Sequence, residues 1–593
     1  MAEEKKIESK KKLKLFKERK AKEKGEKSGF IKDLKIAYRN LEDPEEYIKK
    51  TLLPSIAFGI FLIAFPFTVG KYLPVAINAT ALSSIGFIIM VLGALYPYIS
   101  WKNRENEING KMHFFITHLR VLAISDLSLK DIINVIGEKR KVYKSLGDEI
   151  RKISILSTQW KLPLARAFRF ISDRTPSKML RDFLDRFSQS LVSGVSHREF
   201  IEQEQGAVME EYKTMYESAN ENLTILNEVY ISLLISITFV MCFGIILPLI
   251  MGAGDINTFV YGSAFALIIT EGLLLYLLKS MMPADEIWPQ TGEKSETEKN
   301  LYRLLFLSIC SSLMIGLILF YLKFLGYQPF NLLPGEILVS IALTPLIVPG
   351  IKTFLEEQDI FRRERNFLGF LPALGSISAM KGGKINESVR YLSEKDYGIL
   401  TPHIRNLYKR LSTRIDDDAA WEWFGVDTCS NYIQRGSEMF REATYAAANP
   451  RDVARMITEN IRKIRDLRLK KHAIIKTTVS LFLGITFGIA FSVYVSLVIA
   501  QRLNKIWSEA GQPFENLQQI NIGAILTTVP PQIYSNIFAI VFLVLIVHSF
   551  ILSLTIKELR GSHFLITFLY FVPMVWIVSI TSFVVQTFLG GYI

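Results

Sequence analysis

Long apolar runs alternate with two long polar stretches along this chain. A bilayer core of about 30 Å needs about 20 apolar helical residues, and nine segments meet that measure. These predicted membrane spans are residues 52–70, 76–99, 229–251, 258–278, 303–325, 333–350, 474–500, 534–556 and 564–589. The pattern therefore predicts an all-α, polytopic membrane protein with about nine transmembrane helices.

The polar stretches divide the spans into three groups. The connections within each group are short, whereas two connections are each a little over 120 residues long. The predicted organisation is a charged tail (1–50), a transmembrane hairpin (51–100), a first polar block (101–228), four spans (229–350), a second polar block (351–473) and three spans (474–593).

Both polar blocks show the period of amphipathic helices. Leu129, Ile132, Ile133 and Ile136 fall on one helical face, and the apolar residues of 176–192 repeat at spacings of three and four. Strand-like alternation does not occur in the blocks. Each block is long enough for a compact bundle of five or six helices, and we expect each to have its own core.

The two blocks resemble copies of each other. Residues 162–177, moved forward by 253 positions, meet 415–430, so that Ala167 meets Ala420 and Thr175 meets Thr428. Two amphipathic bundles can share such a pattern by chance. A duplication is favoured because each block also directly precedes apolar helices.

The distribution of basic residues predicts the orientation. The formal net charge is +13, and Lys and Arg number 17 in residues 1–50, 20 in 101–228 and 22 in 350–471. The positive-inside rule places these segments in the cytoplasm and Ile593 outside the cell membrane. Topology therefore explains the charge without nucleic acid. The three cysteines form no CxxC pair, so neither a disulfide framework nor a zinc site is indicated.

Two motifs suggest catalysis but lack essential parts. The segment from Gly382 to Ile385 has neither the upstream glycine nor the Ser/Thr of a phosphate-binding loop. The string Gly252-Ala253-Gly254-Asp255 matches the GxGD of intramembrane aspartyl proteases, but no second Asp lies within a span. We therefore expect a non-enzymatic protein without a cofactor or a metal site.

Glu271 lies inside the fourth predicted span, where a carboxylate is costly and by default suggests a functional site. The alternative is an interhelical hydrogen bond, which we favour because no Lys or Arg lies within a facing span. His548 in the eighth span is similarly isolated. Pro248, Pro345 and Pro573 mark either broken helices of a transporter or tolerated kinks.

Clusters of charge flank the spans. The run from Arg462 to Lys471 is explained as a topogenic signal, but acidic residues contribute little to topology. We predict that a protein partner contacts an acidic triplet and a basic cluster of the second polar block: Asp416, Asp417 and Asp418 with Arg362, Arg363 and Arg365.

This arrangement resembles the F family of type II secretion and type IV pilus machines. The resemblance rests on a helical block followed by membrane helices, repeated once, and on the Leu-rich start LAISDLSLKDIINVI and the Thr-x-Ser break of each copy. The extra N-terminal hairpin and the three C-terminal spans are similar to the platform proteins of the archaellum branch.

The resemblance implies a scaffold in the cytoplasmic membrane. Such platforms dock a hexameric secretion ATPase and relay its cycle to archaellin- or pilin-like filament subunits in the lipid bilayer, and a homodimer or higher oligomer is implied. Alternatives within the family are platforms of adhesive type IV pili or of type II secretion-like systems. A transporter, which needs convergent intramembrane charges, and a membrane-bound enzyme are the more distant alternatives.

Overall fold

The computed structural model describes most of the chain as helices joined by short turns. The described residues are 34–38, 43–68, 79–251, 256–283, 285–289, 294–327, 333–413, 416–511 and 531–592. They contain no strand. The chain divides into two units, of which the first comprises residues 1–105 with 174–178 and the second comprises the remainder.

The first unit contains the hairpin that precedes the first polar block. Its elements are α2 (Pro44–Tyr47), the π-helix η1 (Ile48–Leu52), α3 (Leu53–Thr68) and the part of α4 (Ala79–Ala123) that ends at Glu105. Asp43 caps α2 by accepting a hydrogen bond from the backbone nitrogen of Glu46 at 3.1 Å. The Tyr47 hydroxyl donates to the carbonyl of Gly93 at 3.0 Å and so fixes α2 against α4.

The second unit contains a membrane-type helical group. Its members are α10 (His197–Met251), α11 (Ile256–Met281), α12 (Glu296–Phe324), α14 (Gly335–Leu343), η3 (Thr344–Leu346), α15 (Ile347–Met380), α20 (Pro450–Gly511), α21 (Pro531–Arg560), η7 (Phe564–Ile566) and α22 (Thr567–Tyr592). Buried apolar side chains from α10, α11, α20, α21 and α22 form one cluster at its centre.

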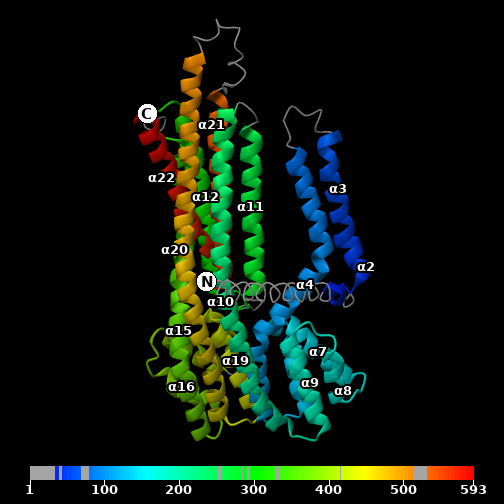
Figure 1. Cartoon of the computed structure of the whole chain (residues 1–593). Coiled ribbons are helices and arrows are strands. Elements are labelled where there is room, and N and C mark those ends of the chain that lie inside the picture. Colours follow the sequence, from blue (N-terminus) through cyan, green and yellow to red (C-terminus); the bar gives the residue numbers. More distant parts are fainter. Residues whose placement is uncertain are drawn as a thin grey trace, which may run out of the picture. The chain divides into compact units, whose positions relative to one another are not determined.

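Eight helices within the described residues are long and apolar enough to cross a membrane. They match eight of the nine predicted spans. The remaining prediction, 76–99, lies partly outside the described residues, and α4 covers its described part. Helices α10 and α20 contain 55 and 62 residues, so each extends about 80–90 Å and continues far beyond a bilayer core (Figure 1).

The polar blocks are built from short helices between the long ones. The first block has α5 (Leu129–Glu138), α6 (Arg140–Tyr143), α7 (Ser145–Thr158), α8 (Leu164–Ser172) and α9 (Lys178–Val192). The second block has α16 (Ile385–Ser393), η4 (Gly398–Leu400), α17 (Thr401–Thr413), α18 (Asp417–Asp427) and α19 (Asn431–Tyr445). Helices α18, α19 and α20 begin 253 positions after α8, α9 and α10 respectively, which supports the proposed duplication.

The two blocks share one hydrophobic core, which differs from the separate cores that we expected. The buried cluster includes Phe115 and Phe183 of the first block together with Phe367 and Phe440 of the second. The rings of Phe114 and Tyr432 lie 5.3 Å apart across the boundary. The physical reason is that α4 presents apolar side chains to both blocks, Phe115 to Phe183 and Phe114 to Tyr432, so a common core leaves less apolar surface in water.

The three prolines have different effects on their helices. At Pro345 the helix is interrupted by η3, which separates α14 from α15, whereas α10 and α22 continue through Pro248 and Pro573. Close helix packing occurs at Gly350 of α15, where a Cβ atom would lie 2.5 Å from the backbone nitrogen of Leu569 in α22. Small residues permit such approaches between membrane helices.

Candidate functional site

A short segment between α11 and α12 connects both polar blocks to the membrane-type helices. We call Asp285–Trp288 the junction segment. Figure 1 shows α11 among the upper helices and α16 and α19 of the second block in the region below. Each of the four junction residues makes contacts with elements distant in sequence.

Asp285 is the buried centre of the junction segment. The Arg468 Nε atom of α20 lies 2.9 Å from both carboxylate oxygens of Asp285. The hydroxyls of Tyr432 in α19 and Tyr216 in α10 donate to the same carboxylate at 3.0 and 3.2 Å. Arg468 also pairs with Glu364 of α15 at 3.2 Å, so one guanidinium connects the junction to the second block.

Glu286 connects the junction to the first block. Its carboxylate lies 3.0 Å from Lys111 of α4 and 3.0 Å from Lys144, which occupies the turn between α6 and α7. The Lys111 side chain is only 4% exposed. Removal of the Glu286 carboxylate would therefore leave the buried Lys111 ammonium group without a partner, which would lower the free energy of unfolding.

Backbone contacts fix the junction on two sides. The nitrogen of Asn431, the first residue of α19, donates to the Ile287 carbonyl at 3.0 Å, and the Ile287 nitrogen donates to the Gly561 carbonyl at 3.2 Å. Gly561 has a φ of +66°, and a Cβ atom there would lie 1.9 Å from the Asp285 carbonyl oxygen. Both facts require glycine in this turn between α21 and η7.

Trp288 extends the junction toward the last membrane hairpin. Its indole nitrogen donates to Glu357 of α15 at 3.3 Å. The Glu357 carboxylate also accepts hydrogen bonds from the Ser562 hydroxyl at 3.0 Å and from the His563 backbone nitrogen at 3.2 Å. One buried carboxylate therefore holds the junction, α15 and the α21–η7 turn together.

The electrostatics favour charged carboxylates at the junction. Burial raises the pKa of Asp285, but the charges of Arg468 and Lys471 and the hydrogen bonds from Arg468 and Tyr432 outweigh it, and they hold that pKa well below its usual range. Burial likewise raises the pKa of Glu286, whereas Lys111 and Lys144 lower it, with a net decrease. Both acids are therefore ionised at neutral pH.

A second polar cluster lies between the two blocks. His118 Nε2 of α4 donates a hydrogen bond to the Glu442 carboxylate of α19 at 2.9 Å, and His118 Nδ1 is hydrogen-bonded to the Tyr143 hydroxyl at 2.9 Å. Lys139 contacts both Glu438 and Glu442. Burial raises the pKa of Glu442, but the hydrogen bond and charge of His118 and the charge of Lys139 reduce it to about 2.

The predicted acidic triplet lies at the start of α18, and all three side chains have contacts within the chain. Asp416 caps α18 by accepting from the Ala419 nitrogen at 3.0 Å. Asp417 accepts from the Tyr445 hydroxyl at 3.1 Å, and Asp418 pairs with Arg441 while its side chain remains 72% exposed. A partner can therefore reach Asp418 directly, whereas a change at Asp416 also affects the helix.

The predicted basic residues of α15 differ in exposure. Arg362 is exposed and pairs with Asp359 at 3.1 Å, and Arg365 is also exposed. Arg363 is largely buried, pairs with Glu356 at 2.8 Å and donates to the Thr428 carbonyl at the end of α18 at 3.1 Å. Arg363 therefore has a structural role within the second block.

Glu271 and His548 lie in contact, although the sequence gives no sign that they are paired. Both side chains are fully buried, and the Glu271 carboxylate of α11 contacts His548 Nδ1 of α21. His548 Nε2 lies 3.4 Å from the Thr486 hydroxyl of α20. The expectation of an isolated His548 is therefore wrong, whereas the interhelical hydrogen bond favoured for Glu271 is present.

The two rejected catalytic motifs have different outcomes. Gly382 and Gly383, with φ of +64° and +84°, form the turn after α15, and the Gly383 nitrogen donates to the Ser378 carbonyl at 2.8 Å. This is a helix C-terminal motif of the kind that favours glycine. Asp255 and the glycines before it lie outside the described residues.

The junction cluster was missed because charged residues were assigned to the surface. The run from Arg462 to Lys471 was explained by topology, yet Arg468 is 2% exposed. A signal was present in the spacing: Arg468 and Lys471 continue the buried stripe of α20 formed by Ile457, Ile461, Ile464, Arg468, Lys471 and Ile475. Charges on an apolar helical stripe indicate buried pairs.

Membrane helices that continue into helical polar blocks define a multi-pass membrane protein of the secretion-platform class. In agreement, the family profile of the type II secretion system protein F matches residues 115–245, from α4 of the first block into α10. No solved structure matches the chain.

Two relatives extend the similarity over nearly the whole chain. The flagella accessory protein J of Methanocaldococcus jannaschii is 33% identical over 551 residues, covering 92% of this chain and 95% of that protein. The flagella accessory protein J of Methanococcus voltae is 33% identical over 547 residues, covering 92% and 96%. The chain therefore belongs to the flagella accessory protein J family.

Proposed function

We propose that this chain is the membrane platform of an archaellum or type IV pilus-like assembly machine. The family membership and the arrangement of membrane helices and polar blocks support this function. In the proposed orientation the N-terminus and both blocks are cytoplasmic and Ile593 is outside. This orientation places the α11–α12 connection, the α21–α22 connection and both blocks on the same side of the membrane. The contacts of the junction segment support that placement, because these four parts touch one another there.

The platform would dock a hexameric cytoplasmic ATPase and transmit its cycle to filament subunits in the bilayer. A subunit that keeps about 20 apolar residues in lipid, at about −0.3 to −0.6 kcal/mol for each strongly apolar residue, costs on the order of 10 kcal/mol to extract. This work must come from a separate ATPase through a mechanically continuous connector.

The observation that carries the coupling proposal is the junction segment. Through Glu286 it is paired to the first block, through Asp285 and Arg468 to the second, and its ends lead into α11 and α12. Helices α10 and α20, which contribute Tyr216 and Arg468, continue without interruption from the blocks into the membrane group. A displacement of either block would therefore act on the membrane helices at one place.

Glu286→Gln tests the coupling. The amide keeps the size of the side chain but removes its charge from Lys111 and Lys144. We expect lower abundance, because the buried Lys111 loses its carboxylate partner; per molecule inserted in the membrane, co-purification of the ATPase should be normal but filaments should be several-fold fewer. Glu210→Gln is the matched control, because Glu210 pairs with Lys213 at 2.8 Å within one exposed helical turn. Unchanged filament assembly in Glu286→Gln would contradict a coupling role for the junction.

The ATPase contact is proposed to include the acidic triplet of α18 and the exposed basic residues Arg362 and Arg365. Asp416→Asn/Asp417→Asn/Asp418→Asn removes three charges, and Asn retains the ability to cap a helix. Several exposed pairs acting together contribute on the order of 1 kcal/mol, so we expect about fivefold weaker ATPase binding at low salt, with a smaller effect at high salt.

A charge-matched control separates this contact from general electrostatics. Glu387→Gln/Glu394→Gln/Glu459→Gln removes the same charge from exposed positions elsewhere on the second block. Binding should remain near the wild-type level in this control. Equal weakening in both triple variants would show that only net charge matters, and wild-type binding in the Asn variant would place the contact elsewhere, first in residues 101–228.

A further inference from the structure

Lys144 has a strained backbone in the turn between α6 and α7. Its φ and ψ are +49° and −124°. These angles are close to those of the first central residue of a type II′ turn, about +60° and −120°, where glycine is the usual residue. A side chain at such a position is crowded by its own backbone, so any residue other than glycine raises the energy of the turn.

The corresponding turn of the second block avoids this strain. The elements that follow the two turns, α7 and η4, begin at Ser145 and Gly398, which are 253 positions apart, the offset of the duplication. In the second block the positive φ, of 57°, falls on Gly398, one position later than Lys144 in the comparison. Glycine has no Cβ atom and adopts such a φ freely. A block can therefore be built without the strain that the first block has at Lys144.

The side chain of Lys144 explains why a lysine is useful at this place. Its Nζ atom lies 3.0 Å from Glu286 of the junction segment and 3.9 Å from Glu107 of α4. The side chains of Lys144 and Glu286 are 35% and 25% exposed, whereas the other lysine on Glu286, Lys111, is only 4% exposed. Water can therefore reach the Lys144 pair, and this pair can separate at a much smaller desolvation penalty than the Lys111 pair.

Contacts on both sides of Lys144 confine any change to the turn itself. Before it, the buried Tyr143 is hydrogen-bonded to His118 at 2.9 Å. Within the turn, the Lys144 nitrogen donates to the Arg140 carbonyl at 2.7 Å, and the Asp148 nitrogen donates to the Lys144 carbonyl at 3.0 Å. A rotation about the Lys144 backbone would open these two hydrogen bonds first, so their amide hydrogens report on the state of the turn.

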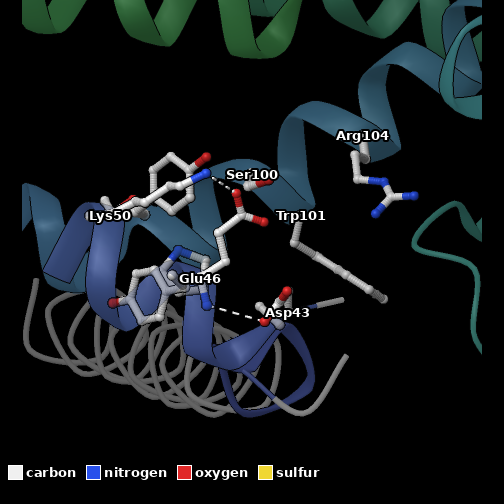
Figure 2. Close-up of a pocket in the computed structure, with 11 residues that line it drawn as sticks. Asp43, Glu46, Lys50, Ser100, Trp101 and Arg104 are labelled. Atoms are coloured by element: carbon white, nitrogen blue, oxygen red, sulfur yellow. Dashed lines mark hydrogen bonds and ion pairs between the residues drawn. The ribbon is translucent and has the colours of Figure 1, made fainter. Parts of the chain in front are cut away.

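Lys50 of the first unit shows a lysine pair without backbone strain. Figure 2 shows its side chain directed toward Glu46, one helical turn earlier, and the charged atoms lie 2.6 Å apart. Lys50 lies within η1, and the residues that flank this element, Tyr47 and Leu53, have ordinary helical angles. Loss of the Lys50 pair would therefore release no strain. Lys144 differs because a strained backbone and a water-accessible ion pair occur in one residue.

We propose that Lys144 is a releasable latch between the first block and the junction segment. In the latched state, which the structure shows, the ion pair with Glu286 holds the turn in its strained form. In the released state this pair is broken and the Lys144 backbone relaxes, while Lys111 keeps Glu286 in place. This role rests on the proposed coupling function, because a release step lets the first block move without unpacking the membrane helices.

Hydrogen-exchange mass spectrometry of the full-length protein in detergent tests the latch with two variants. Lys144→Met and Lys144→Gly both remove the ion pair, but only Lys144→Gly also removes the strain. After correction for intrinsic rates, the peptide covering 144–148 should exchange about fivefold or more faster in Lys144→Met than in Lys144→Gly, because the remaining strain favours the released turn. Equal exchange in the two variants would show that the turn stores no strain and would overturn the latch.

Two further variants test the role of the ion pair. Lys144→Arg restores a cation, so its exchange in residues 144–148 should lie within about twofold of wild type. Lys141→Met removes an exposed lysine of α6 that forms no ion pair within the described part of the chain, and exchange in the turn should stay at the wild-type level. Equal acceleration in Lys141→Met and Lys144→Met would show that any loss of positive charge loosens the turn, which would refute the role of Glu286 as the latch partner.

Filament counts per inserted molecule separate the latch from the platform function. Lys144→Met and Lys144→Gly should both assemble several-fold fewer filaments, because neither can form the latched pair, and Lys144→Arg should assemble them normally. Normal assembly in Lys144→Met would show that the latch has no part in coupling and would overturn the proposal. The platform function would still stand in that case, since the exchange measurement requires neither filaments nor an ATPase and Glu286→Gln tests the coupling separately.

Discussion

Arg468→Met is the perturbation whose effect follows most directly from the structure. The guanidinium of Arg468 serves the carboxylates of Asp285 and Glu364, donates to the Glu286 carbonyl at 3.4 Å, and lies 4.1 Å from the centre of the Tyr432 ring. Methionine keeps an unbranched side chain of similar length but removes the guanidinium from two buried carboxylates, so that Glu364 loses its paired cation and Asp285 retains only the charge of Lys471 nearby.

The expected magnitude is large because the pair is buried. Breaking a buried ion pair by removing one partner costs about 3–5 kcal/mol, since the remaining charge is uncompensated. If this energy is lost from the closed junction, the local opening equilibrium shifts by a factor of roughly 10² to 5 × 10³. Arg468→Lys should be intermediate, because an ammonium cannot reproduce the forked contacts of a guanidinium.

Hydrogen-exchange mass spectrometry measures this opening directly. The Ile287 amide donates to the Gly561 carbonyl and the Asn431 amide donates to the Ile287 carbonyl, so peptides covering 285–289 and 431–433 report on the junction. Both peptides should exchange much faster in Arg468→Met than in wild type. Peptides from α12, which leaves the junction, should change little if the helix itself stays folded.

A neighbouring ion pair provides the control. Lys470, two residues further along α20, pairs with Glu217 of α10 at 2.8 Å, but the lysine side chain is 64% exposed. Lys470→Met should therefore leave exchange at the junction unchanged. Exchange in Arg468→Met within about threefold of wild type would refute the conclusion that the Arg468 pairs hold the junction closed.

Three further predictions concern packing and polar contacts elsewhere in the second unit. Gly350→Ala should destabilise the protein by about 1–3 kcal/mol in thermal unfolding, because the new Cβ atom would lie 2.5 Å from a backbone nitrogen of α22. Gly369→Ala in the same helix is the control: its Cβ atom would enter open space, so stability should not fall. His548→Phe should lower the unfolding midpoint by more than Glu271→Gln does, since only His548→Phe leaves the fully buried Glu271 carboxyl without its partner. Equal midpoints in the two variants would argue against the Glu271–His548 contact. The depressed pKa of Glu442 contributes stability that is present above the ordinary pKa of a glutamate and is lost as the pH falls toward about 2. Glu442→Gln should therefore reduce the acid sensitivity of the protein in a proteolysis assay.

The sequence by itself determined the membrane spans and the helical blocks. A bilayer permits few solutions for a spanning segment, so about 20 consecutive apolar residues indicate a helix almost without regard to the rest of the chain. The amphipathic stripes were equally local: Leu129, Ile132, Ile133 and Ile136 are all buried as expected. The offset of 253 between the blocks was visible because a duplication preserves spacing even where identity is low.

Tertiary structure alone decided which charges are functional candidates. Asp285 stands in a short connection without any local pattern, and its partners Tyr432 and Arg468 are separated from it by 147 and 183 positions. Glu271 and His548 are 277 positions apart. Sequence periodicity reports which face of a helix is buried, but it carries no information about which other helix covers that face, and ion pairs depend on that choice.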